Sequence, residues 1–270
     1  MQFIIKILSI IAPGWVVKKA IHTINNPKVK KLREHETEVI QQAKEKTIKF
    51  NDFDIKTYRW GSGTKSILLV HGWEGQAGNF AEIIDALVDN DYTVYAFDAP
   101  SHGFSSSGET SVFEFSELTA KMLQDTGVKE IISHSFGGVA TTIALSQNPA
   151  IAIDKYLLLT TPDKFVDRID TVAQQVGISE KIKARLIKTI EAHYQLDVTQ
   201  TNVSAYAPKT NVKSAKIIHD IDDKVVPIEY SRNVCAHWPV CTLEEISGTG
   251  HFRILRTPEV IEKIITFFKH

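Results

Sequence analysis

The sequence predicts an α/β protein with a mostly parallel central sheet, helices on both faces and one helical insert. Short apolar runs recur along the chain, as expected of strands that are buried on both faces of a sheet. Runs with helical periodicity separate them, and turn-forming or polar residues follow the apolar runs. This alternation favours parallel strands, which gather their functional loops at the carboxyl ends of the strands.

The elements follow one another regularly from residue 47. Strands at 47–50 and 54–60 flank Asn51-Asp52 and predict a hairpin. Further strands are expected at 66–70, 92–97, 155–159, 215–219 and 242–246, and one runs from Glu130 towards Ser135. Helices are expected at 76–90, at 112–126 with a stop at Gly127, and at 139–145.

The alternation breaks at 161–211, where helical patterns occupy 164–176 and 180–194. A long insert at the carboxyl end of a sheet is typical of a helical cap, which forms a lid or pocket wall. Its apolar side chains could face a substrate or the core, and we expect core packing for each of them. They are Phe165, Ile169, Val172, Leu186 and Ile190.

A serine in a strand–turn–helix context is the most informative feature of the chain. An apolar strand leads from Glu130 to Ser135, and a helical run from Val139 follows at once. This context holds a serine on a strained turn with its hydroxyl out of the sheet. Small neighbours are needed because the turn brings its backbone close to adjacent elements. Ser133 stands where glycine is usual, so the local motif alone also fits an ordinary turn.

A glycine-containing turn upstream supplies a possible partner. The strand at 66–70 ends in the turn 71–75, which contains Trp73. Such a turn can aim a backbone N–H at a developing oxyanion, while the second N–H comes from the residue after the nucleophile. We assign these two donors to the backbones of Trp73 and Phe136. The alternative is a plain strand-to-helix turn with a buried tryptophan.

An acid and a histidine follow in the order that acyl-transfer chemistry predicts. Asp220, Asp222 and Asp223 come just after one predicted strand, and His251 lies in a glycine-containing loop after the last strand. A general base must take the proton of the Ser135 hydroxyl, and a carboxylate must hold the imidazole in the right tautomer. Together these groups favour a catalytic role over an incidental surface histidine.

Over about residues 47–270 the chain resembles the α/β-hydrolase superfamily. The resemblance implies that Ser135, on the elbow, is the nucleophile and that His251 is the histidine of the late Gly-x-Gly-His loop. The common acid of that family lies four residues before a proline, which maps onto Asp223 before Pro227.

Neighbouring acids leave the choice of carboxylate open. Asp222 and Asp220 are close alternatives, and relatives that place the acid after the preceding strand point to Asp163. The segment 71–73 resembles the oxyanion loop of the family. The segment 98–105 resembles its D-x-P-x-H-G-x-S loop, for which we expect a structural role beside the elbow.

The resemblance implies a serine hydrolase that cleaves a carboxylic ester or thioester of a small molecule through an acyl-enzyme. No metal or organic cofactor is expected for this chemistry. The alternatives are a lyase, a haloperoxidase-like enzyme or a ligand-binding protein on the same fold. A lipase that acts at a membrane surface is a further alternative.

Composition fits one domain with an extension. The chain has 270 residues, of which 43% are hydrophobic, so it can bury a full core. A net charge of −1 gives no reason to expect a nucleic-acid partner. Cys235 and Cys241 are too few for a disulfide framework and lack a metal-ligand spacing with histidine. A reducing, cytoplasmic location is therefore expected.

Residues 1–46 form an N-terminal extension of basic and apolar character. Residues 1–33 contain lysine and arginine but no aspartate or glutamate. Lys6, Pro13 and Lys18 interrupt its apolar runs, which are too short to span a bilayer. A secretory signal is not expected, since no basic residue precedes the first apolar run and no small-residue cleavage site follows.

The second half of this extension has the pattern of an amphipathic helix. Val17, Ala20, Ile21 and Ile24 recur at helical spacing, opposite a face that carries lysines. We expect this face to pack on the body of the protein or to pair subunits, in preference to a peripheral contact of residues 1–33 with an anionic membrane. The sequence leaves the oligomeric state open.

Overall fold

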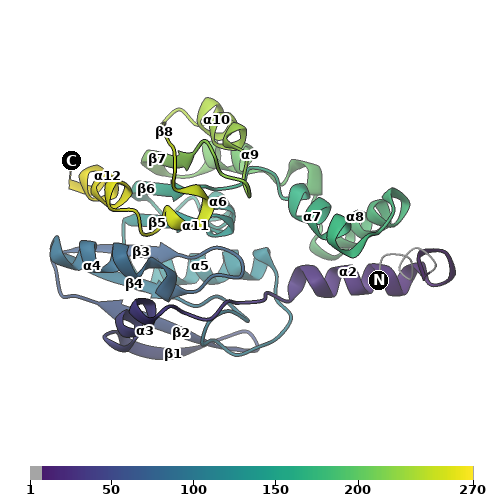
Figure 1. The fold of residues 1–270 in the computed structure, drawn as a ribbon, viewed down its shortest axis with the longest axis horizontal. Helices are drawn as coiled ribbons and strands as arrows, with labels where there is room; N and C mark the ends of the chain where they lie inside the picture. Colours follow the sequence, from purple (N-terminus) through teal and green to yellow (C-terminus); the bar gives the residue numbers. More distant parts are fainter. Residues whose placement is uncertain (1–7, 270) are drawn as a thin grey trace.

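The computed structural model describes residues 8–269 and contains an eight-stranded sheet (Figure 1). The strands lie in the order β1-β2-β4-β3-β5-β6-β7-β8. β2 is antiparallel to both β1 and β4, and the other neighbouring pairs are parallel, which confirms the mostly parallel sheet. Their bounds are β1 Lys44–Phe50, β2 Phe53–Trp60, β3 Lys65–Val70, β4 Tyr92–Phe97, β5 Glu130–His134, β6 Ile153–Leu159, β7 Val212–Asp220 and β8 Cys241–Ile246.

Helices cover both faces of the sheet, as the alternating pattern predicts (Figure 1). Side chains of α4 (Ala81–Asp89) and α12 (Pro258–Lys269) belong to one buried apolar cluster. Side chains of α5 (Val112–Thr126), α6 (Phe136–Gln147) and α10 (Ile228–His237) belong to the other. The expected helix at 76–90 begins with a 3₁₀ turn, η1 (Ala77–Phe80), before α4. The two clusters hold the sheet rigid beneath the loops at its carboxyl edge.

Turn chemistry sets two of the element boundaries as expected. Phe50 pairs with Phe53 across a two-residue turn, in which Asn51 has a φ of 48°. Asparagine is one of the few residues that tolerate this left-handed conformation. Gly127 ends α5 with a φ of 66°, and its N–H donates to Leu123 O.

The N-terminal extension packs on the rest of the chain. Its helix α2 (Pro13–Asn25) runs beside two helices of the insert, α7 (Val166–Val176) and α8 (Glu180–Tyr194) (Figure 1). The side chains that make this contact are buried: Val16, Val17, Ala20 and Ile24. The preference for packing is therefore confirmed for the described residues, whereas the apolar run 3–5, Lys6 and residue 7 lie outside them.

A second extension helix, α3 (Glu34–Gln41), leads into the sheet. Arg33 at its start forms ion pairs with Glu36 and with Glu82 of α4. β1 begins at Lys44, so the predicted boundary after residue 46 was wrong by a few residues and falls inside a strand. Propensity alone does not reveal this, because the first residues of β1 are exposed and polar.

The insert at 161–211 is helical, as predicted. Besides α7 and α8 it contains the short elements η2 (Val198–Gln200), α9 (Val203–Tyr206) and η3 (Ala207–Lys209). The five apolar side chains singled out from the sequence are all buried, and Phe165 and Ile190 among them also line a pocket described below. Among residues 8–269, no helix has the length and apolar character needed to cross a membrane.

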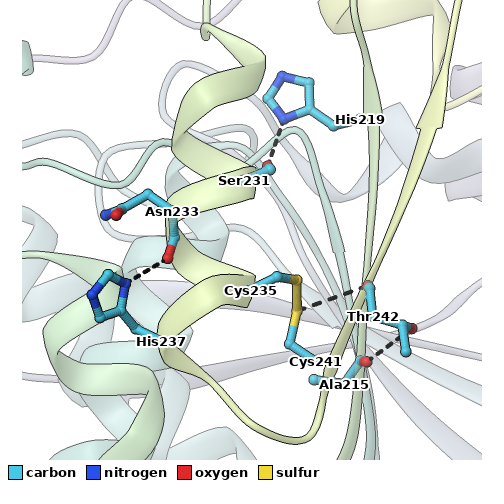
Figure 2. The surroundings of a disulfide bond; sticks show 8 residues. All are labelled: Ala215, His219, Ser231, Asn233, Cys235, His237, Cys241 and Thr242. Carbon is cyan, nitrogen blue, oxygen red and sulfur yellow. Dashed lines mark hydrogen bonds between the residues drawn. A yellow bond between two sulfur atoms is a disulfide. The ribbon is translucent and has the colours of Figure 1, made fainter.

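The two cysteines form a disulfide between the end of α10 and the start of β8 (Figure 2). The Cα atoms of Cys235 and Cys241 are 5.1 Å apart, within the ordinary range for a disulfide. Trp238, in the loop that the disulfide closes, is buried against Tyr156 of β6. The low cysteine count argued against a disulfide framework, and a single short-range pair of this kind forms without one.

Candidate active site

Ser135 lies on the turn between β5 and α6, where the sequence predicts it. Its φ of 52° and ψ of −127° are values that residues other than glycine rarely adopt. The Ser135 N–H donates to Leu159 O at 2.9 Å, and the Gly138 N–H donates to Ser135 O at 2.9 Å. Strain of this kind persists where surrounding structure fixes the backbone, and it is common at active sites.

The neighbours of Ser135 are small because the turn packs tightly against the end of β3. A Cβ atom added at Gly137 would lie 2.3 Å from His71 O, so a side chain there would force the backbone apart. Ser133 is fully buried, and its Oγ lies 2.8 Å from the hydroxyl of Tyr156. A serine therefore fits where glycine is usual, and its hydroxyl gains a hydrogen bond.

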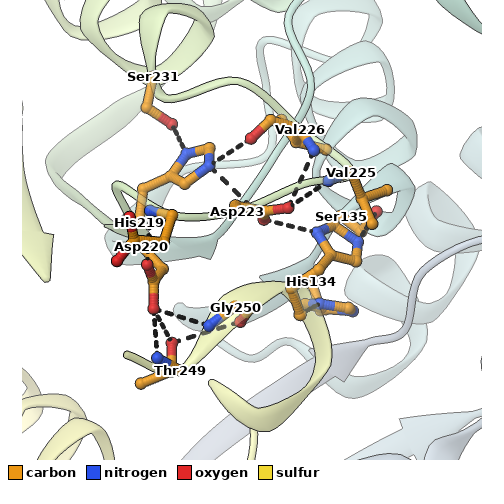
Figure 3. A network of polar contacts seen from close by, with 12 residues as sticks. His134, Ser135, His219, Asp220, Asp223, Val225, Val226, Ser231, Thr249 and Gly250 are labelled. Atoms are coloured by element: carbon orange, nitrogen blue, oxygen red, sulfur yellow. Dashed lines mark hydrogen bonds and ion pairs between the residues drawn. The ribbon is translucent and has the colours of Figure 1, made fainter. Parts of the chain in front are cut away.

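His251 bridges Ser135 and Asp223, which are both labelled in Figure 3. It lies in α11 (Gly250–Arg253), and its Nε2 is 3.1 Å from Ser135 Oγ while its Nδ1 is 2.8 Å from Asp223 Oδ2. An ionised carboxylate only accepts hydrogen bonds, so Nδ1–H donates to Asp223 and Nε2 accepts from the serine hydroxyl. The structure thus brings together the three residues predicted as nucleophile, base and acid.

Asp223 is held by backbone donors as well as by His251. Its Oδ1 accepts from Val225 N–H at 2.7 Å and from Val226 N–H at 3.0 Å. Burial opposes ionisation of this carboxyl, but the hydrogen bond and charge of His251 and the two backbone N–H groups lower its pKa below the usual range. Asp223 is therefore an anion at neutral pH and can stabilise an imidazolium.

The other candidate acids have different positions. Asp222 is exposed. Asp220 is buried and accepts hydrogen bonds from the Gly250 N–H at 2.7 Å and from the hydroxyl and N–H of Thr249 (Figure 3). Asp163 accepts hydrogen bonds from α9 and α10. Asp220 thus fixes the loop that carries His251, and Asp163 ties the insert to α10.

The two predicted oxyanion donors lie on either side of the elbow. Trp73 follows β3, Phe136 follows Ser135, and both residues line the cleft that contains Ser135 and His251. Within residues 8–269, neither backbone N–H donates a hydrogen bond to the chain. Phe136 also begins α6, and N–H groups in the first turn of a helix carry the positive end of its dipole. Both groups are available to a ligand oxygen.

The D-x-P-x-H-G-x-S loop has the structural role expected for it. Asp98 is buried and accepts hydrogen bonds from the Tyr58 hydroxyl, the Ala77 N–H and the Phe104 N–H, each at 2.8 Å. The carboxylate therefore joins β2, η1 and its own loop.

Three buried histidines support the elbow and the acid, and the sequence argument assigned no role to them. His71 donates from Nδ1 to Gly72 O at 2.7 Å and accepts the Ala99 N–H at Nε2. Burial lowers its pKa, so it stays neutral and fixes the turn before Trp73. His134 donates from Nε2 to the backbone carbonyl of His251 at 2.9 Å, and burial lowers its pKa to about 3.

His219 is the third of these histidines and lies next to Asp223 (Figure 3). Its Nε2 donates to Val226 O at 3.0 Å and lies 3.7 Å from Asp223 Oδ2, while its Nδ1 accepts from the Ser231 hydroxyl at 2.6 Å. Burial lowers the pKa of this imidazole as well. His219 ends a predicted strand, and that position at the carboxyl edge was the only sequence signal available for it.

The cleft around Ser135 and His251 has a volume of about 560 Å³. Lys30 and Arg33 of the N-terminal extension line this cleft, and so does Arg168 of α7 in the insert. No sequence motif marks these contributions, because they depend on how the extension and the insert fold over the sheet. Within the described residues, no group of three or more histidine, cysteine, aspartate or glutamate side chains could hold a metal ion.

Known proteins share this architecture. A family model described as the alpha/beta hydrolase fold matches residues 65–189. The chain is 28% identical over 150 residues to the dihydrolipoyllysine-residue acetyltransferase component of an acetoin cleaving system from Cupriavidus necator. That match covers 53% of this chain but only 39% of the relative.

Two further similarities extend over more of the chain. The uncharacterized hydrolase YugF of Bacillus subtilis is 22% identical over 250 residues, which cover 76% of this chain and 90% of YugF. The crystal structure of a bacterial membrane phospholipase A superposes with a TM-score of 0.66 at 14% identity, covering 99% of this chain and 98% of that one. The chain has the α/β-hydrolase fold, and its residues 65–189 match the family model of that fold.

Proposed function

We propose that the protein is a serine hydrolase that cleaves a carboxylic ester or thioester of a small molecule. The observation that carries this proposal is the continuous hydrogen-bond chain from Ser135 Oγ through His251 to Asp223, at 3.1 and 2.8 Å, inside a cleft. A strained serine, a neutral base and a buried anion in this order are the parts that acyl transfer needs. Similarity to YugF, which is named a hydrolase, agrees with the proposal.

In the proposed mechanism, Ser135 Oγ attacks the acyl carbonyl while His251 Nε2 takes the hydroxyl proton. Asp223 stabilises the imidazolium, and the N–H groups of Trp73 and Phe136 bind the oxyanion. The imidazolium then gives its proton to the leaving alcohol or thiol, which departs and leaves an acyl-enzyme. Water activated by His251 attacks that ester, and release of the acid restores Ser135.

Replacement of the nucleophile tests the proposal directly. Ser135→Ala should abolish turnover of a p-nitrophenyl ester and labelling by a fluorophosphonate probe, whereas the circular dichroism spectrum and thermal unfolding should stay close to wild type. Ser133→Ala is a matched control, since it removes a hydroxyl two residues away that contacts Tyr156 instead of His251. Undiminished hydrolysis by Ser135→Ala would overturn the assignment. A lyase or ligand-binding protein on this fold would show neither hydrolysis nor labelling.

The described N-terminus favours a second possibility, action at a membrane surface. Ile10, Ile11 and Trp15 are 84%, 74% and 52% exposed, and Lys18 and Lys19 are exposed nearby. Apolar side chains next to lysines are typical of segments that lie on anionic lipid. The variant Ile10→Asp/Ile11→Asp should lose binding to phosphatidylserine vesicles, while Val240→Asp, at another exposed apolar position, should keep it. Equal vesicle binding by both variants would exclude this possibility.

A further inference from the structure

A second pocket, of about 230 Å³, lies beside the catalytic cleft between α2, the start of α5 and α8. We call it the α2 pocket. Its walls are mainly aliphatic and aromatic, with Ile21 and Ile24 from α2 and Ile190 and Tyr194 from α8. The Phe113 ring closes one side and packs on Tyr194, with ring centroids 4.6 Å apart. A pocket with such walls suits an apolar group of a ligand.

Three polar side chains of the α2 pocket are already engaged within the protein. Ser111 caps α5 by accepting the Glu114 N–H, and Glu109 contacts His22 of α2 at 2.6 Å. Thr189 donates its hydroxyl to the carbonyl one turn earlier in α8. These groups therefore need no hydrogen bonds from a ligand. The apolar walls of the pocket are poorly solvated by water, so burying an apolar chain there is favourable.

The α2 pocket meets the catalytic cleft at the oxyanion donors. Trp73 and Phe136 line both spaces, and so does Arg168. The Arg168 guanidinium makes no hydrogen bond or ion pair with the part of the chain that the structure describes, and its Nε is buried. Arg168 therefore lies where the two spaces meet, whereas Ile21 and Ile24 of α2 and Ile190 and Tyr194 of α8 line the α2 pocket alone.

This arrangement gives α2 a role in addition to packing. One face of the helix carries the buried contacts with the insert, and the same face supplies Ile21 and Ile24 to the pocket. Glu109 and Asn25 tie the end of α2 to the segment before α5, since His22 contacts Glu109 and the Thr110 N–H donates to Asn25 O at 2.9 Å. The helix is therefore held in place as a pocket wall.

We propose that the α2 pocket binds the acyl chain of the substrate, that the preferred acyl group is a straight medium-length fatty chain, and that α2 determines the accepted chain length. The inference rests on the proposed hydrolase function, and it adds the substrate class and a specificity element outside residues 65–189, which match the family model. Each methylene that the pocket buries should raise kcat/KM about fourfold, up to the length at which the pocket is full.

Ile21 is only half-buried, so substitutions there can make the α2 pocket smaller or larger and thereby test whether its size sets the preferred chain length. Ile21→Trp fills the pocket, so the ratio of kcat/KM for p-nitrophenyl octanoate to that for the acetate should fall about tenfold or more. Ile21→Ala enlarges it, so the preferred chain should lengthen from octanoate towards dodecanoate. Lys19→Trp places the same bulk on the exposed face of the same helix and should leave the ratio unchanged. An unchanged ratio in folded Ile21→Trp would overturn the inference.

A binding measurement separates this inference from the proposed function. Calorimetric titration with octanoic acid needs no turnover, so it can be done with wild type, Ile21→Trp, Lys19→Trp and Ser135→Ala. Wild type, Lys19→Trp and Ser135→Ala should bind the acid alike, and Ile21→Trp should bind it about tenfold more weakly or not at all. Octanoic acid binding without any esterase activity would refute the proposed hydrolase function but support acyl-chain binding in the α2 pocket. Esterase activity without such binding would refute acyl-chain binding in the α2 pocket but support the proposed hydrolase function.

Discussion

The carboxylate of Asp223 is selected by its surroundings and not by its neighbours in the sequence. Asp222, one residue earlier, is exposed, whereas Asp223 is buried between two backbone N–H groups and an imidazole. Both acids follow the same strand, and only the resemblance to the α/β-hydrolase superfamily, through the spacing to Pro227, pointed to Asp223. Which of the two side chains faces His251 depends on the turn that follows β7, because neighbouring residues in that turn point in different directions.

Asparagine variants at these two positions should separate them sharply. Asp223→Asn keeps the shape but offers an N–H or a neutral oxygen to His251 Nδ1, which favours the wrong tautomer; kcat for an ester should fall by about three to four orders of magnitude. Asp222→Asn is the matched control and should stay near wild type. Ester hydrolysis assays measure both. A near wild-type kcat for Asp223→Asn would remove this residue from the proposed triad.

At the scale of elements, the strand–helix alternation was predictable because most of the strands contain short apolar runs. The strands β1 to β8 and the helices α4 to α8 lie within a few residues of their predicted positions, whereas α9 and α10 were not predicted. Ser135, His251 and Asp223 were found because each follows the carboxyl end of a strand. The α2 pocket and the buried His134 and His219 were not, since they arise from packing between segments that are distant in sequence.

The disulfide between α10 and β8 allows a prediction for these elements. Cys235 and Cys241 close a short loop, which should stabilise the fold by about 2 kcal/mol, mainly by restricting the unfolded chain. Cys235→Ser/Cys241→Ser should lower the free energy of unfolding by that amount in urea titrations. A reducing agent should destabilise wild type equally and leave the double variant unaffected. Free thiols in wild type purified without reductant would contradict the prediction.

For the whole molecule, acid sensitivity should come from buried imidazoles. Burial lowers the pKa values of His71, His134 and His219, and also that of His102, a buried histidine in the 98–105 loop; the values for His102 and His134 fall to about 3. These groups stay neutral in the folded protein, while in the unfolded chain they take up protons below their ordinary pKa of about 6.5. Stability is therefore full above that pH and is lost as the pH falls.

Urea unfolding between pH 7.5 and pH 5.0, at constant ionic strength, measures this effect. Each buried imidazole should cost about 1 kcal/mol as the pH falls from 6.5 to 5.5. The pKa values of Asp220 and Asp223 are lowered, so these carboxylates lose their stabilising contribution only at more acidic pH. They therefore do not change the free energy of unfolding in the range that is measured. A free energy of unfolding that stays constant down to pH 5.0 would show that these histidines are not held neutral.

The contact between α2 and α8 has a consequence for how the protein is synthesised. The apolar face of α2 leaves the ribosome early, but its partner helix follows roughly 160 residues later. At typical elongation rates this interval is on the order of ten seconds. During it Val16, Val17 and Ile24 lack the native surface that α8 provides, so the nascent segment keeps part of this apolar face uncovered until residue 194 has emerged.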